Sequence, residues 1–398
     1  MDWRGHSKNQ DGALTIPDNW IFIHYYEAIS LLFRVENALR VFVYVVLKAE
    51  VGETWENLEI SSDENSKTSI QALARQRIEQ NRAFGYLSYP INSPLMHLTS
   101  GELVRLIVHD SYWKYFKPYF MAAKNVVTLK LQEIGNIRNA LAHFRPIKSG
   151  DVEVVKQNAS QVLTTVEKTL VDIIRCDQGV PTNTDDAWYS ALRSVGTQRT
   201  QLSFSQSVDS NWIRINMNYF PPILSQSVLT SGKHVTYKVI NIRPLDVLRH
   251  FGALSTSVIF LSEVVSYVPM PKDLKPKFKK VLRFTFSRKT LSNKYDEIRK
   301  GFEELLKQID DETDLLSEDQ LARGKLLNSC NVSASNKGTE DHSWWDITSS
   351  SLQTSLEEEY PAEFWRPLYA FNPDFISNTE WYPWMPVQIS EEEIDIPL

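Results

Sequence analysis

The first 176 residues carry apolar and polar positions at the spacing of amphipathic helices. Between Trp20 and Ala49 apolar side chains recur every three or four residues and would form one buried stripe along a long helix. That stripe consists of Tyr25, Ile29, Leu32, Val35, Leu39, Phe42 and Val46. Similar spacing predicts helices over residues 69–84, 100–109, 122–144 and 152–174, the third with apolar positions at Val126, Leu129, Ile134, Ile137 and Leu141. Residues 1–176 are therefore predicted to be an all-α helical domain.

The pattern changes beyond Cys176. Residues 177–200 contain Gly, Pro, Thr, Asn and Asp without a regular apolar period, which is typical of a linker. Apolar and polar residues then alternate as in β-strands over residues 212–220, 235–242 and 281–286, and a helical period returns over 292–309. Residues 201–309 are therefore predicted to form an α+β domain with antiparallel strands.

The C-terminal part divides by composition. Residues 310–343 are acidic and polar and are predicted to be a loop. Residues 344–398 are rich in proline and tryptophan, so we expect an aromatic tail that packs on the preceding α+β domain. The predicted fold class is thus multidomain, with a helical bundle, an α+β domain and an aromatic, proline-rich tail.

Composition narrows the classes of function. The 398 residues carry a formal net charge of −6, so the chain as a whole does not attract nucleic acid or an anionic membrane. Its two cysteines fit a reducing compartment, and neither has a metal-ligand spacing with histidine. The longest apolar run, residues 41–47, is too short to span a bilayer, and the first residues do not resemble a signal region. We expect a soluble cytoplasmic protein without a metal, a cofactor or a membrane partner.

One short segment holds residues suited to phosphate chemistry. Arg138 is followed by Asn139 and, five residues after the arginine, by His143. A histidine takes or gives a proton near neutral pH, and an arginine binds phosphate oxygens with a planar fork of donors. Pro146 disfavours helical geometry at the residue before it, so the helix should end within two residues of His143. The negative end of the helix dipole would then stabilise the protonated histidine.

The spacing of this pair has a geometric consequence. Five residues along an ideal helix place Arg138 and His143 roughly 140° apart, so the two side chains do not point at one atom from the same stripe. A two-fold copy of the helix would bring two arginines and two histidines around a single phosphate. The alternative is structural, because Arg and His near a helix C-terminus also satisfy its carbonyls. With eight histidines and twenty arginines in the chain, chance alone yields roughly 0.4 such pairs.

A wider set of residues resembles a known family. Residues 36–40 have the form Glu-x-x-Leu-Arg in the first predicted helix, and a later helix ends in Ile-Arg-Asn-x-x-Ala-His. Together, over about residues 20–176, these features resemble the HEPN superfamily, an all-α fold whose active members are ribonucleases with an Arg-x(4–6)-His motif. In this chain Arg138 matches the motif arginine, Asn139 the polar residue that often follows it, and His143 the histidine. The resemblance implies an all-α HEPN-like bundle and a metal-independent endoribonuclease.

The resemblance also implies a mechanism and partners. An RNA 2′-hydroxyl would attack the adjacent phosphate, with His143 as general base or acid, Arg138 stabilising the developing charge and Asn139 orienting the phosphate or the arginine. The products would be a 2′,3′-cyclic phosphate and a 5′-hydroxyl, formed by a homodimer without a cofactor. Relatives commonly act in toxin–antitoxin, abortive-infection and other anti-phage systems, so an antitoxin or a defence-system protein is a further partner to expect.

Two alternatives stay open. One is a catalytically inactive HEPN dimer that acts as a scaffold or ligand sensor in a defence complex, and the other is an RNA-binding module without cleavage. The latter depends on residues 272–300, which hold eleven Lys or Arg against three acidic residues and would otherwise be a solvated surface. Its candidate residues for contacting RNA or an acidic partner are Lys277, Lys279, Lys280 and Arg283. Glu36 and Arg40 are interpreted as a structural helix pair, and the aromatic residues at 112–120 as core or dimer interface.

Overall fold

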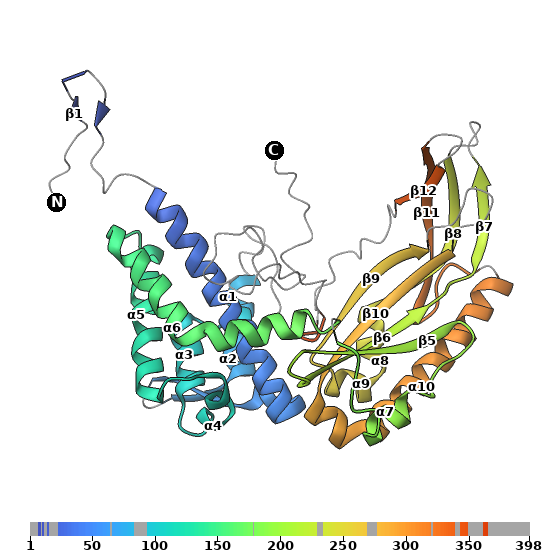
Figure 1. Cartoon of the computed structure of the whole chain (residues 1–398), viewed down its shortest axis with the longest axis horizontal. Coiled ribbons are helices and arrows are strands. Elements are labelled where there is room, and N and C mark those ends of the chain that lie inside the picture. Colours follow the sequence, from blue (N-terminus) through green and yellow to red (C-terminus); the bar gives the residue numbers. More distant parts are fainter. Residues whose placement is uncertain are drawn as a thin grey trace. The chain divides into compact units, whose positions relative to one another are not determined.

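The chain forms two compact units, seen in a computed structural model (Figure 1). The described residues are 7–8, 10–11, 14–15, 23–63, 66–82, 94–177, 179–228, 234–268, 277–319, 321–338, 343–348 and 361–364. The chain passes from the first unit to the second between Ile174 and Arg175. Helices dominate the first unit, and the second combines helices with antiparallel sheets. The predicted mixture of helices and antiparallel strands is confirmed.

The N-terminal unit contains two short hairpins as well as helices in its described residues. Its helices are α1 (Ile23–Val51), α2 (Ile70–Arg82), α3 (Ser100–Val108), α4 (Trp113–Phe116), α5 (Lys124–Ala142) and α6 (Ser149–Ile174). Its hairpins pair β1 (Ser7–Lys8) with β2 (Leu14–Thr15) and β3 (Glu59–Asp63) with β4 (Ser66–Ser69), and its 3₁₀ turns are η2 (Gly52–Asn57), η3 (Pro94–His97) and η4 (Lys117–Tyr119). The all-α prediction is therefore wrong for the hairpins, because strands this short and polar leave no apolar period in the sequence.

Helix α1 is central to this unit and contacts α3, α5 and α6. Its residues 41–47 are all buried, as expected for a helix segment covered on every side. The ring of Phe42 lies 5.8 Å from that of Phe116 and 5.9 Å from that of Phe120, measured between ring centroids. Phe116 and Phe120 are buried, so the aromatic residues at 112–120 supply core, which is one of the two roles expected for them.

The buried face of α5 differs from the predicted one. Its buried positions are Val127, Leu131 and Ile134, whereas Val126 and Leu129 are 42% and 55% exposed. Apolar residues occupy more than one face of this helix, and only its contacts with α1, α3 and α6 decide which face becomes core. Apolar side chains that the pattern assigned to the core therefore lie on the surface.

The second unit contains two four-stranded antiparallel sheets. Its strands are β5 (Thr200–Gln206), β6 (Trp212–Tyr219), β7 (Ile223–Val228), β8 (His234–Ile242), β9 (Phe260–Val268), β10 (Lys277–Ser287), β11 (Leu327–Gly338) and β12 (Ser343–Thr348). Its helices are α7 (Ala187–Leu192), α8 (Pro244–His250), α9 (Gly252–Ser257) and α10 (Arg288–Glu318). The strand orders are β5-β6-β10-β9 and β12-β11-β8-β7.

Long helix α10 packs on one side of the first sheet (Figure 1). Alternate residues of β6 and β10 point into this core, as the period of two predicts. Phe302 of α10 lies edge-on to Phe284 of β10, with 5.0 Å between ring centroids. Leu305 and Ile309 continue the buried stripe of α10 by the spacing of a helix.

Three segment predictions need correction or restriction. The predicted linker 177–200 contains α7, whose Trp188 and Leu192 are buried in the core. The predicted loop 310–343 contains the end of α10 and all of β11, because Asp311, Asp314 and Glu318 lie on the exposed side of that helix and hide its apolar period. Of the predicted tail 344–398, only residues 344–348 and 361–364 are described, and there Phe364 is buried in the core of the second unit.

No helix among the described residues is both long and apolar enough to cross a membrane.

Candidate active site

The predicted motif lies at the C-terminal end of α5, where the helix closes with a defined cap. His143 is the cap residue, and Phe144 takes a left-handed backbone conformation with a φ of 53°. The N–H of Phe144 donates to the carbonyl of Leu141 at 2.9 Å, and the N–H of Arg145 donates to that of Ala140 at 2.8 Å. This pair of hydrogen bonds is the Schellman arrangement that satisfies the last carbonyls of a helix. The predicted end of the helix near His143 is confirmed.

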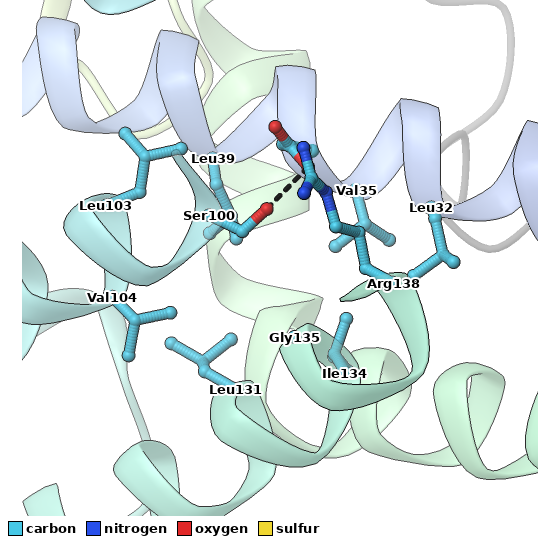
Figure 2. Close-up of a pocket in the computed structure, with 11 residues that line it drawn as sticks. Leu32, Val35, Leu39, Ser100, Leu103, Val104, Leu131, Ile134, Gly135 and Arg138 are labelled. Carbon is cyan, nitrogen blue, oxygen red and sulfur yellow. Dashed lines mark hydrogen bonds and ion pairs between the residues drawn. The ribbon is translucent and has the colours of Figure 1, made fainter. Parts of the chain in front are cut away.

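Arg138 turns from α5 toward α1 and meets a carboxylate there. Its Nε donates to Oε2 of Glu36 at 3.1 Å, and its Nη1 donates to Oδ1 of Asn139 at 3.4 Å. Figure 2 shows Arg138 extending from α5 toward α1, with Ser100 of α3 beside it. The Arg138 side chain is 35% exposed, so part of its guanidinium reaches solvent. Two of five N–H donors are engaged, which leaves three without an acceptor among the described residues.

Glu36 is held in place by more than Arg138. Its Oε1 accepts a hydrogen bond from Arg40, and its Oε2 accepts one from the Ser100 hydroxyl at 2.5 Å. Arg40 also donates to Oδ1 of Asn37 at 3.0 Å and to the Leu98 carbonyl at 3.2 Å. The carboxylate is only 12% exposed, so this is a partly buried network rather than a surface pair. Such a network fixes the orientation of every group in it.

The charges of this network act on Arg40. Burial lowers the pKa of its guanidinium, Glu36 raises it, and the like charge of Arg138 lowers it again. Two arginines therefore share one carboxylate, and the site keeps an excess of positive charge. An anionic ligand at Arg138 would relieve the repulsion between the two guanidinium groups.

A cavity of about 360 Å³ opens beside Arg138, between α1 and α5. It is lined by Ile29, Leu32, Phe33, Glu36, Arg40, Arg138, Leu141, Ala142 and Phe144. A second, much smaller cavity of about 20 Å³ lies among apolar side chains of α1, α3 and α5 (Figure 2). Leu32, Glu36 and Arg138 line both cavities. The lining of the larger cavity thus combines three charged residues with six apolar ones.

His143 is exposed and does not line the cavity that contains Arg138. Its backbone N–H donates to the carbonyl of Asn139, and no described residue makes a hydrogen bond or ion pair with its imidazole. Asn139 is exposed as well. One copy of the chain thus brings Arg138 and Asn139 together and leaves the histidine apart, in line with the expected angle between them around the helix.

The candidate basic residues of β10 do not form one surface. Lys280 is buried and paired with Glu263, so the prediction that it contacts RNA or an acidic partner is wrong. Lys277 is exposed, and Lys279 and Arg283 are half-buried. Their odd-numbered positions place these three on the opposite side of the strand from Lys280. The local excess of charge in the sequence therefore overstates the charge on any one face.

The sequence did not reveal which residues contact the motif. Glu36 lies 102 positions before Arg138, and Ser100 joins them from a third helix, so no local pattern connects the three. Ile29 belongs to the predicted buried stripe but is 55% exposed, and Phe33, outside that stripe, is 40% exposed. Their place at the rim follows from helix packing alone.

Within the described ranges, no group of three or more His, Cys, Asp or Glu residues lies close enough to hold a metal ion. Comparisons of the chain with protein-family models, with curated proteins and with solved structures find no match.

Proposed function

We propose that the chain is a metal-independent endoribonuclease of the HEPN type that acts as a homodimer. The observation that carries this proposal is Arg138, fixed by Glu36 in the lining of an open cavity, with His143 exposed at the end of the same helix. The arginine keeps free donors for a phosphate, and the histidine is accessible to a partner group.

The reaction needs only groups of this kind. A histidine accepts the proton of an RNA 2′-hydroxyl while the 2′-oxygen forms a bond to the neighbouring phosphorus. The bond from phosphorus to the 5′-oxygen then breaks, and a second histidine donates a proton to that oxygen. The products are a 2′,3′-cyclic phosphate and a 5′-hydroxyl. Arg138 stabilises the extra negative charge on the phosphorane, and Asn139 contacts the same phosphate or the arginine.

Glu36 acts as a positioning residue in this proposal. It occupies Nε of Arg138 and so directs the remaining donors of the guanidinium. Arg40 and Ser100 hold the carboxylate in turn. The interpretation of Glu36 and Arg40 as a purely structural pair is thereby extended, since one member also contacts the motif arginine.

The homodimer supplies the second histidine. Because His143 does not line the cavity of its own Arg138, one copy offers half of the groups that the reaction requires. The exposed side chains of Ile29 and Phe33 beside the cavity suit contact with a second copy. Such a nuclease fits a toxin or effector of anti-phage defence, restrained by an antitoxin or another defence-system protein.

The test compares wild type with Arg138→Ala and His143→Ala in cleavage of total RNA, with analysis of the new ends. Arg105→Ala and His109→Ala are matched controls, because both residues are exposed in the same unit and neither lines the cavity. We expect 2′,3′-cyclic phosphate ends from wild type and both controls, and a loss of at least about a hundred-fold in the two motif variants.

Three results would contradict the proposal. Cleavage by His143→Ala at the wild-type rate removes the histidine from the mechanism, and a strictly monomeric, active wild type removes the composite site. A dimeric wild type that leaves RNA intact during phage infection indicates the inactive scaffold instead.

A further inference from the structure

Phe144 has an unusual combination of exposure and backbone conformation. Its side chain is 96% exposed, and its φ of 53° lies in the left-handed region that bulky residues rarely adopt. It occupies the position just after the cap of α5, where glycine is the usual residue because it lacks a Cβ. The chain thus displays an aromatic ring at a site where glycine would fold more easily, which indicates a use for the ring.

The surroundings of this ring are electropositive. Phe144 lines the cavity that contains Arg138, and its sequence neighbours are His143 and Arg145. Arg145 and Lys148 are exposed, and the first acidic residue after the motif, Asp151, accepts a hydrogen bond from the backbone N–H of Lys148 at 2.8 Å. The acid nearest to Arg138, Glu36, is already engaged by two arginines. An exposed ring among cations is the arrangement with which proteins hold unpaired nucleotides, the ring stacking on a base and the cations binding the backbone.

We propose that Phe144 is a stacking subsite for the nucleobase beside the phosphate bound at Arg138. This inference rests on the proposed ribonuclease function and specifies its substrate as single-stranded RNA, since a base inside a duplex has no free face to offer. The subsite tolerates any base, because every base has a π-face. The cations beside the ring favour a nucleotide over an apolar surface of a second copy, because a phosphate neutralises them and an apolar surface does not.

The test measures binding of a 2′-O-methylated single strand of about twelve nucleotides, which lacks the nucleophile and stays intact. Wild type is compared with Phe144→Tyr, Phe144→Leu and Phe144→Gly by fluorescence anisotropy at fixed salt, with sedimentation velocity on each protein. Glycine suits the left-handed backbone, so that variant should fold at least as well as wild type. Leucine keeps an apolar side chain without a π-face.

We expect affinity to fall about ten-fold or more in both Phe144→Leu and Phe144→Gly, and to stay near wild type in Phe144→Tyr, with unchanged sedimentation. Wild-type affinity for the single strand in Phe144→Leu would overturn the proposal. A loss of affinity that accompanies dissociation of the dimer would also overturn it, because that result assigns the ring to a protein interface. If cleavage requires Arg138 and His143 but substitution of Phe144 leaves RNA binding unchanged, the subsite is rejected and the nuclease proposal is retained. Ring-dependent binding by a protein that never cuts RNA rejects the nuclease and retains the subsite.

Discussion

Replacing Glu36 with glutamine tests how the buried network supports Arg138. The substitution keeps the shape of the side chain and removes the negative charge that two arginines share. Hydrogen bonds to charged groups contribute about 1.5–3 kcal/mol each to the free energy of unfolding. The contribution from Arg138 is smaller, because its side chain is 35% exposed and water screens its interaction with Glu36. Arg40, at 13% exposed, keeps its acceptors on Asn37 and Leu98. A net loss of about 2 kcal/mol follows, equivalent to a fall in Tm of about 4–8 °C.

The same substitution should lower activity by releasing the arginine. A misplaced catalytic group costs up to about a hundred-fold in rate, so we expect cleavage by Glu36→Gln to fall between about ten- and a hundred-fold. Glu102→Gln is the matched control, because Glu102 forms a buried pair with Arg77 through two bonds of 2.7 Å outside the cavity. That variant should lose stability without losing cleavage per folded molecule.

The assay is a double-mutant cycle on initial cleavage rates, normalised to the folded fraction from circular dichroism. If Glu36 acts through Arg138, adding Glu36→Gln to Arg138→Ala should lower the residual rate little further. Independent, multiplying effects of the two substitutions would refute the positioning role. Equal losses in Glu36→Gln and Glu102→Gln would reduce the role of Glu36 to stability.

Two further predictions concern stability. Burial raises the pKa of Glu102, but the hydrogen bonds from Arg77 and Thr99 together lower it by more. The pKa of Glu102 in the folded chain therefore lies below the ordinary value. The carboxylate therefore contributes its full stabilisation above an unfolded pKa of about 4.3, and this contribution is lost as the pH falls through the lower folded value. In urea titrations the free energy of unfolding should fall more steeply with decreasing pH in wild type than in Glu102→Gln. Equal slopes of the two proteins would contradict this prediction. Glu312 accepts three backbone N–H groups from residues 325–327, at 2.9–3.1 Å, so Glu312→Ala should cost about 2–5 kcal/mol in chemical denaturation. Glu312→Gln, which keeps an acceptor, should lose less, and equal losses would show that the backbone groups find water instead.

Local patterns predicted those features that depend on neighbours in the sequence. Pro146 and the apolar period placed the end of α5 near His143, because a proline restricts the residue before it. The period of two located strands β6, β8 and β10. Where an element's exposed face is polar, the pattern misled: the acidic side of α10 was taken for a loop, and the short helix α7 for a linker.

The amino-acid sequence by itself determined the helical first half, the strands β6, β8 and β10 of the second, and the three residues of the motif. Only the tertiary structure decided that Glu36 meets Arg138 across 102 positions, that Lys280 is buried, and that His143 lies outside the cavity of its own arginine. The reason is that periodicity reports which side of an element is apolar, whereas packing decides what each side meets. A site made by α1, α3 and α5 together is a property of that packing.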